Sequence, residues 1–179
     1  MPHDVKGETM GFQTKTRLLS LGILWSVLLA FTVILSVAGA ETFSGKVSGV
    51  YAGDMITVFR GDKVQTVRLF GIACPKENAA TARKAKEFSE ESVFGRTIEV
   101  EVVGEVKKTK QVIALARFEG KLLNEELVRG GLAWVHPKLC KQEVCVQWKA
   151  LEAQAQAEKR GLWAGPQQAP PWQPKKAKR

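Results

Sequence analysis

The side chains that most often hold metals or act as nucleophiles are scarce in this sequence of 179 residues. Three cysteines are too few for a disulfide scaffold, and two histidines, His3 and His136, are too few for a histidine-rich metal site. Any metal ion would therefore have to be held by oxygen atoms. The 27 basic residues exceed the 18 acidic ones, which gives a formal net charge of +9. A positive surface suits nucleic acid, anionic lipid or wall polymers, although a solvated surface without a partner has the same composition.

Two of the three cysteines stand five residues apart. Cys140 and Cys145 predict a local disulfide rather than a metal-binding pair, provided that this segment lies outside the cytoplasm. A turn is expected between them, because residues five apart in a regular helix exceed the limit of about 7 Å between bridged Cα atoms. Cys74 is left over. We expect it to be a small buried residue rather than an activated thiol, because no histidine lies near it in the sequence.

Residues 1–40 are expected to lie outside the folded domain. The run 18–37 carries no charge, and as a helix it would span about 30 Å, the thickness of a membrane's hydrocarbon core. Lys15 and Arg17 precede it, and small residues close it at 38–40. We predict a signal peptide cleaved after Ala40, or alternatively an uncleaved anchor that gives membrane association through residues 18–40. Either way the remainder is expected to be extracytoplasmic: secreted, periplasmic or membrane-anchored.

From residue 41 onward, apolar and polar residues alternate with period two. Three consecutive strands are marked by the pairs Val47 and Val50, Ile56 and Val58, and Val67 and Leu69, with Phe70 expected to face away from Val67 and Leu69. A helix over 78–94 follows, then strands over 97–103 and 112–118, a short helix over 122–129 and a last helix over 144–160. Five strands with interposed helices predict a small barrel that is mainly β with about three packed helices.

The domain is expected to cover residues 41–165, and residues 166–179 form a tail that is Pro-rich and then basic. Trp172 is expected to pin this tail to the body. The aromatic residues divide into two groups. Trp134, Trp148 and Trp163 stand at core-facing spacings and are interpreted as packing residues, whereas Phe59, Phe70 and Trp172 are candidates for stacking on nucleic-acid bases.

Five short motifs follow one another from residue 53 to residue 163. They are Gly53-Asp54 after a Val-rich strand, the run 67–72 followed by Pro75, the run 120–129, Gly131-Leu132-Ala133, and the run 151–155 through Gly161-Leu162-Trp163. Together they resemble the staphylococcal nuclease (thermonuclease) family, and the resemblance covers residues 43–163. It implies a five-stranded OB-type barrel with helices around it and a nucleic-acid groove, in agreement with the strand count above.

The resemblance also implies calcium-dependent hydrolysis of phosphodiester bonds. That reaction needs several oxygen ligands around a hard cation and a carboxylate that orients or deprotonates the attacking water. It also needs guanidinium groups that stabilise the negatively charged transition state. The family carries these parts in three sequence elements, and this chain retains few of them.

The first element, at residues 52–54, has the pattern Asp-Gly-Asp in the family. Here Asp54 remains as a single metal ligand, and Ala52 replaces the first aspartate. In the second element, Arg68 is retained as the phosphate-binding arginine. The second metal carboxylate is replaced by Ala73, and the glutamate that serves the water is replaced by Lys76. These substitutions remove both acid functions and predict that no cofactor binds, with Ca²⁺ expected only if the chain is an active nuclease.

In the third element, the catalytic arginine of the family corresponds to Gln111. These substitutions suggest a specific hypothesis: Lys76 places its ammonium beside Arg68, where the family holds the metal cation. A phosphate would then be bound by Arg68 and Lys76 directly, with Asp54 orienting one of them. The alternative is that Lys76 extends along the surface while Asp54 and Arg68 form an ordinary ion pair.

Three functions remain open at this point. The favoured one is an exported, catalytically impaired module that binds nucleic acid or another phosphate-bearing anion. The second is a calcium-dependent nuclease in which Glu77, one residue after Lys76, takes over as the base. The third is an interaction module that docks on a protein or an envelope surface through its basic tail, residues 175–179.

Overall fold

The computed structural model describes residues 41–76, 80–166 and 168–173. The predicted signal or anchor segment with its apolar run 18–37 lies outside the described residues, as do Glu77 and the end of the basic tail, 174–179. Within the described ranges, none of the helices is long and apolar enough to span a membrane.

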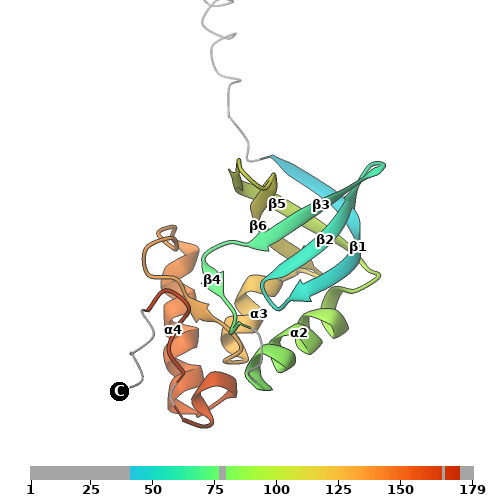
Figure 1. Ribbon diagram of the computed structural model, residues 1–179. Coiled ribbons are helices and arrows are strands. Elements are labelled where there is room, and N and C mark those ends of the chain that lie inside the picture. Colours follow the sequence, from blue (N-terminus) through green and yellow to red (C-terminus); the bar gives the residue numbers. More distant parts are fainter. Residues whose placement is uncertain (1–40, 77–79, 167, 174–179) are drawn as a thin grey trace, which may run out of the picture. The chain divides into compact units, whose positions relative to one another are not determined.

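Five strands form a closed barrel (Figure 1). They are β1 (Thr42–Ala52), β2 (Met55–Arg60), β3 (Lys63–Leu69), β5 (Thr97–Val106) and β6 (Gln111–Phe118). Neighbouring strands pair antiparallel in the order β3-β2-β1-β5-β6, and a parallel pairing of β3 with β6 closes the sheet on itself. The predicted five-stranded barrel is confirmed.

Small β-branched side chains fill the interior of the barrel. Val47, Ile56, Val58, Val67 and Val100 are each at most 1% exposed. Such side chains fit the pleated surface of a sheet, and a slip of one residue would turn this whole set toward water. The alternation that predicted the first three strands therefore also fixes their register.

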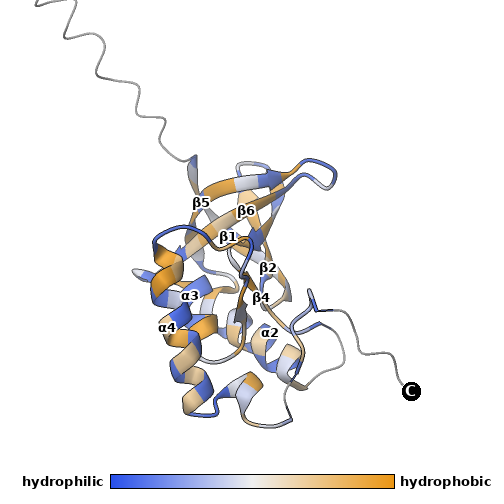
Figure 2. Cartoon of the chain, turned by 90° about the vertical axis from the view of Figure 1, so that its left-hand side faces the viewer, coloured by the Kyte–Doolittle hydropathy of each residue, from blue (hydrophilic) through white to orange (hydrophobic). Residues whose placement is uncertain are grey.

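Three helices pack around the barrel in the described part of the chain. In Figure 1, α2 (Ala80–Val93) and α3 (Leu123–Arg129) lie below the barrel; α2 contacts β1, and α3 contacts β6. The third helix, α4 (Val144–Ala157), packs on α3, and hydrophobic and hydrophilic residues alternate along it in Figure 2. The prediction extended this helix to residue 160, but it ends at residue 157. Lys159 has a φ of 53°, which turns the chain toward the short 3₁₀ helix η1 (Gly161–Trp163).

The tryptophans that were predicted to pack are buried to different extents. Trp148 of α4 is completely buried, and Trp134 is 4% exposed. Trp163 is only half-buried. The packing prediction is therefore confirmed for the first two, and it holds in part for the third.

Three two-residue strands were not predicted. β4 (Ile72–Ala73) pairs antiparallel with β8 (Trp134–Val135), and β7 (Lys121–Leu122) pairs with the end of β6. Two residues are too few to show an alternation, so sequence periodicity could not reveal these strands. The β4–β8 pair fixes the course of the chain after β3, and hence the positions of the residues that follow.

The disulfide between Cys140 and Cys145 is present, as their spacing predicted, with Cα atoms 5.6 Å apart. A turn before α4 brings the two residues together. The sulfur of Cys140 lies close to Gly71, whose φ is 73°, and a Cβ at that position would come within 2.7 Å of it. Glycine is therefore required where the chain leaves β3.

Asn124 ties α3 to the barrel from a completely buried position. Its Oδ1 accepts a hydrogen bond from the Ala116 N–H (3.1 Å), and its Nδ2 donates to the carbonyl oxygens of Phe70 (3.0 Å) and Ala114 (3.3 Å). The buried amide is thereby satisfied on both sides. Because Phe70 directly follows β3, this single side chain links α3 to β6 and to the end of β3.

Replacing Asn124 by alanine is expected to lower the free energy of unfolding by about 2–4 kcal/mol, because the Ala116 N–H and the Phe70 carbonyl would stay buried without partners. Gln65→Ala is a matched control. The Gln65 amide donates to the Lys110 carbonyl at the surface, where water replaces it, so a loss below about 1 kcal/mol is expected. Urea unfolding followed by tryptophan fluorescence measures both losses. Equal losses would contradict the assignment of Asn124 as an anchor.

Candidate functional site

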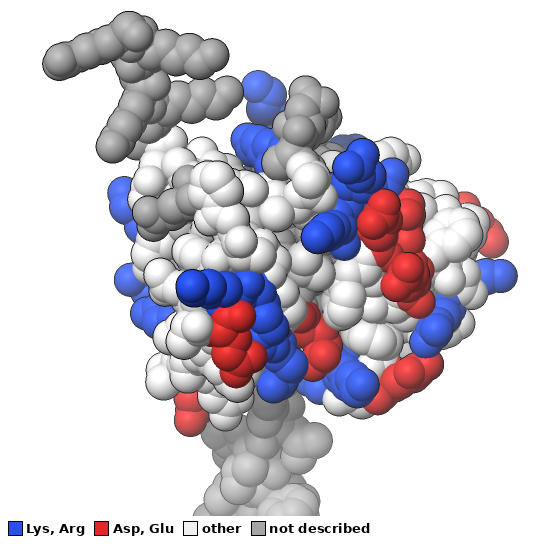
Figure 3. Space-filling model, turned by 90° about the horizontal axis from the view of Figure 1, so that it is seen from below, with Lys and Arg blue, Asp and Glu red and all other residues white. Residues whose placement is uncertain are grey.

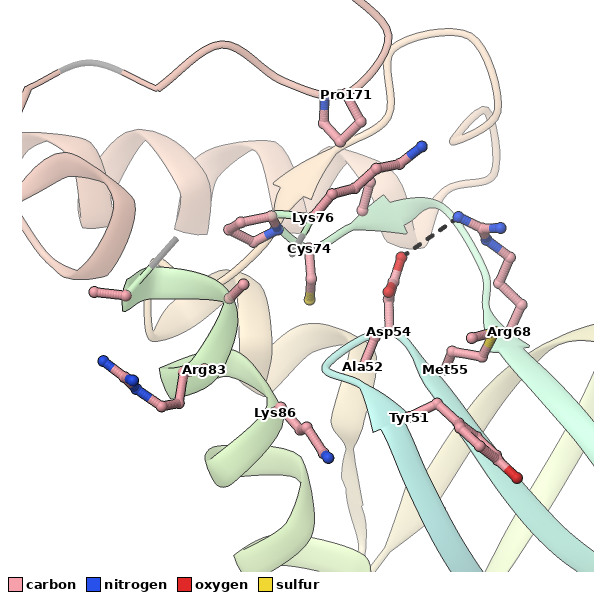
Figure 4. Close-up of a pocket in the computed structure, with 14 residues that line it drawn as sticks. Tyr51, Ala52, Asp54, Met55, Arg68, Cys74, Lys76, Arg83, Lys86 and Pro171 are labelled. Atoms are coloured by element: carbon pink, nitrogen blue, oxygen red, sulfur yellow. Dashed lines mark ion pairs between the residues drawn. The ribbon is translucent and has the colours of Figure 1, made fainter. Parts of the chain in front are cut away.

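A cavity of about 970 Å³ opens between the barrel and α2 (Figure 4). Its walls come from the turn between β1 and β2, the end of β3, β4 with the residues after it, and the first half of α2. Asp54, Arg68, Ala73 and Lys76 all line this cavity. The structure therefore brings together four residues that were selected from separate motifs.

A two-residue turn, Gly53-Asp54, places the acidic side chain at the cavity. The Gly53 carbonyl accepts a hydrogen bond of 2.8 Å from the buried hydroxyl of Ser89 on α2. A Cβ at Gly53 would lie 2.8 Å from the sulfur of Cys74, so only glycine permits the turn to come this close. The turn is held against α2, and this contact fixes the position of Asp54.

Burial raises the pKa of the Asp54 carboxyl above its usual range, because the residue is only 7% exposed. The positive charge of Arg68, hydrogen bonds from the backbone of Cys74 and of Asp54 itself, and the charge of Lys76 oppose this effect. Nη2 of Arg68 lies 3.7 Å from Oδ2 of Asp54, which is an ion pair longer than a hydrogen bond. The side chain of Arg68 is 47% exposed. Its remaining N–H donors are therefore available to a ligand.

Four basic side chains line the cavity against a single carboxylate. Arg68 and Lys76 belong to the barrel side, and Arg83 and Lys86 extend from α2 (Figure 4). Lys86 forms an ion pair of 3.5 Å with Glu90 one turn further along the helix. On the face seen in Figure 3, by contrast, acidic and basic side chains are interspersed. The cavity thus has a local excess of positive charge.

The residues around Asp54 do not fit a calcium ion. Ca²⁺ takes about six to eight oxygen ligands, usually with several carboxylates among them. Ala52 and Ala73 line the cavity with methyl groups where the resemblance implied carboxylates. Across the described ranges, no three His, Cys, Asp or Glu side chains come together in a possible metal site. Glu77, on which the displaced-base hypothesis depends, lies outside the described residues.

Cys74 lines the cavity as a buried free thiol, 4% exposed. Burial, and next the negative charge of Asp54, raise the pKa of this thiol well above its usual range. The thiolate is the reactive form of cysteine, so this side chain fills space and is not activated for chemistry. The structure supports the expectation of a small buried residue at this position.

Several residues singled out from the sequence lie elsewhere. Gln111 begins β6 and does not line the cavity. Phe70 was predicted to face away from the core and to stack on bases, but it is 8% exposed and belongs to the hydrophobic core, so that prediction is wrong. Phe59 is exposed but lies away from the cavity, and the ring of Trp172 packs on His136 with centroids 4.4 Å apart.

Among the aromatic and charged residues of the cavity, sequence reasoning missed three: Tyr51, Arg83 and Lys86. The last two stand three residues apart in a predicted helix, and that spacing places them on one helix face. The spacing alone does not say which face meets the barrel. Tyr51 follows a strand residue that points inward, and its contribution depends on a local irregularity that alternation does not reveal.

The described part of the tail packs beside the cavity. The hydroxyl of Thr81 donates a hydrogen bond of 2.9 Å to Oε1 of Gln168, and Pro171 forms part of the cavity wall. Trp172 rests on His136 and also meets Trp134 edge-on, with centroids 6.4 Å apart. The prediction that Trp172 pins the tail to the body is confirmed.

Comparisons with known proteins agree with the fold. Residues 66–165 match the family described as staphylococcal nuclease homologue. An "uncharacterized endonuclease" of Escherichia coli O157:H7 is 28% identical over 128 residues, which are 72% of this chain and 82% of that protein. A protein of the same description from Haemophilus influenzae is 29% identical over 143 residues, 79% of this chain and 78% of its own length. A micrococcal nuclease of Shigella flexneri is 26% identical over 166 residues, 88% of this chain and 95% of its own length.

The raised pKa of Asp54 predicts a contribution to stability that is lost as the pH rises. Between the ordinary pKa of aspartate and the higher pKa in the folded protein, the native state binds more protons than the unfolded chain does. The free energy of unfolding therefore falls with increasing pH in that window. The variant Asp54→Asn removes this titration, so it is expected to gain more stability over the wild type at about pH 7 than at about pH 3.

Urea unfolding of the two proteins at both pH values measures this difference, with Asp62→Asn in the exposed turn between β2 and β3 as a surface control. A gain that shrinks toward neutral pH would show instead that the folded state favours the ionised carboxylate.

Proposed function

Because the chain belongs to the family of staphylococcal nuclease homologues, we propose that its cavity binds the phosphate groups of nucleic acid and does not hydrolyse them with calcium. The observation that carries this proposal is the charge balance of the cavity, which is lined by four basic side chains and one carboxylate. A phosphodiester backbone matches this charge. Relatives named endonuclease and micrococcal nuclease support nucleic acid as the source of the phosphates.

The basic side chains suit direct binding of a phosphate. The guanidinium of Arg68 offers paired N–H donors that match two phosphate oxygens, and its ion pair with Asp54 orients it. Burial raises the pKa of Asp54, and the charge of Lys76 is one of the influences that oppose this rise, so the Lys76 ammonium acts on the same carboxyl group. Where the family has a carboxylate, this chain therefore has a cation that attracts the ligand itself.

Hydrolysis would need acidic groups that the described lining of the cavity lacks. A single carboxylate does not compete with water for calcium, and no second carboxylate among these residues is available to orient an attacking water. Loss of one transition-state donor costs about 100- to 1,000-fold in rate, and loss of a general base costs about as much. Several such losses at once support a catalytically impaired site.

We place the domain outside the cytoplasm. The Cys140–Cys145 disulfide supports this location, because such bonds persist in oxidising compartments and are rare in the cytosol. The uncharged run 18–37 supports it as well, since it suits an export signal or an anchor. In this location the domain would meet nucleic acid that is secreted or released.

A calcium-dependent nuclease is the second candidate, and the endonuclease names of the relatives favour it. In that case Glu77 would supply the carboxylate that acts on the water, although Arg68 would remain the single arginine of the family pattern in the cavity. Lysine does not reproduce the paired donors of a second arginine.

Arg68→Ala is expected to weaken the binding of a single-stranded DNA oligonucleotide about tenfold or more, because a charge-assisted phosphate contact is lost. Arg117→Ala removes an exposed arginine on β6 outside the cavity and is expected to change affinity less than about threefold. Fluorescence anisotropy at several salt concentrations measures both. The slope of log K against log salt should decrease by about 0.7 in Arg68→Ala. An unchanged affinity in a folded Arg68→Ala protein would contradict the proposed site.

In millimolar calcium, the purified chain is expected to leave plasmid and oligonucleotide DNA intact, and a chelator is expected to leave its affinity for DNA unchanged, because no metal mediates the contact. Gel electrophoresis and anisotropy measure the two properties. Cleavage that requires calcium and disappears in Glu77→Ala would replace the proposed function with the second candidate.

A further inference from the structure

We propose that Tyr51 is a stacking platform for an unpaired base beside the basic side chains, so that the cavity selects single-stranded over double-stranded nucleic acid. This inference rests on the proposed function and names the form of nucleic acid that the site takes. It assigns the choice between the two forms to one residue.

Tyr51 is the only tyrosine of the chain, and it is 65% exposed at the end of β1. It lines the same cavity as Arg68 and Lys76. Of the large hydrophobic side chains that are exposed in the described part of the chain, Tyr51 alone lines the cavity. The others are Phe59, Val64, Phe94, Leu139 and Val146.

A β-bulge places Tyr51 on the wall of the cavity. Val50 pairs with Ile56, and Ala52 pairs with Met55, so the register shifts and Tyr51 has no partner on β2. In a regular strand, Tyr51 and Ala52 would point to opposite faces, whereas a bulge re-aims one of them. Both line the cavity here. The strand thus departs from regular pairing at Tyr51, and the aromatic ring of this residue is exposed to solvent.

The Tyr51 ring is available to a ligand. From the described residues it receives no hydrogen bond, ion pair or ring contact. In the view of Figure 4, the ring extends from the end of β1 away from Asp54, and Met55 lies between the ring and the guanidinium of Arg68. Met55 pairs with Arg68 on the neighbouring strand, and both residues line the same cavity wall as Tyr51. A cavity that is lined by an exposed aromatic ring as well as by basic side chains suits a base that stacks on the ring while cations bind the phosphates.

Stacking on Tyr51 requires a base with a free face. In a duplex, the neighbouring base pairs cover both faces of each base, so an aromatic side chain stacks only on a base that has left the helix. The basic side chains attract the phosphates of either form. Discrimination between the two forms therefore falls to Tyr51.

The test compares three ligands of equal length: a single-stranded oligonucleotide, its duplex, and an abasic oligonucleotide that keeps the phosphates and lacks bases. Wild-type protein is expected to bind the single strand about tenfold more tightly than the other two. Tyr51→Ala is expected to reduce affinity for the single strand to the level of the abasic ligand and to leave abasic binding unchanged. Tyr51→Phe, which keeps the ring, should retain the preference. Phe94→Ala removes an exposed aromatic side chain outside the cavity and should behave as wild type.

A second readout does not depend on affinity. An oligonucleotide that carries 5-iodouracil should crosslink to Tyr51 on irradiation, and mass spectrometry locates the modified residue. If Tyr51→Ala binds the single strand as tightly as wild type does, or if wild type prefers the duplex, the inference is wrong. If phosphate binding still depends on Arg68 in that case, the proposed function is not contradicted. Failure of wild type to bind any of the three ligands would overturn the proposed function itself.

Discussion

The burial of the Asp54 carboxylate is the interaction on which the geometry of the site depends. A carboxylate removed from water is costly unless charges and hydrogen bonds compensate it. Arg68 at 3.7 Å, backbone N–H groups including that of Cys74, and the charge of Lys76 offset part of this cost, while the pKa of the carboxyl stays raised by burial. These partners belong to the end of β3 and to the segment around β4. The acid therefore serves to hold three parts of the chain together and to orient an arginine.

Under the proposed function, the same arrangement separates binding from hydrolysis. Cations hold a phosphate, whereas cleavage of the phosphodiester bond needs acids that hold a metal and act on water. Relative to the pattern that the family resemblance implies, Ala73 and Lys76 remove acids and add a cation at the cavity, and Arg83 and Lys86 add positive charge from α2. All of these features favour an anion in the space where a metal ion would otherwise lie.

Sequence periodicity predicted the barrel because buried β-branched residues such as Val47 and Val67 must alternate with exposed ones. The spacing of Cys140 and Cys145 predicted their disulfide for a similarly local reason. Phe70 was misjudged because β3 ends one residue earlier, at Leu69, so the alternation no longer applies to it. The bulge that exposes Tyr51 depends on pairing between strands, and a single strand's sequence does not contain that information.

Gly53 has a consequence for how related sequences should be interpreted. Its place is fixed by contact with the sulfur of Cys74 and with Ala85 of α2, so a larger residue is barred there for reasons of space alone. The glycine at this point of a related chain is therefore a marker of the architecture, and its presence alone does not indicate catalytic activity. In a comparison of related sequences, the residues at positions 73, 76 and 111 are the ones that would distinguish catalytically active relatives from inactive ones.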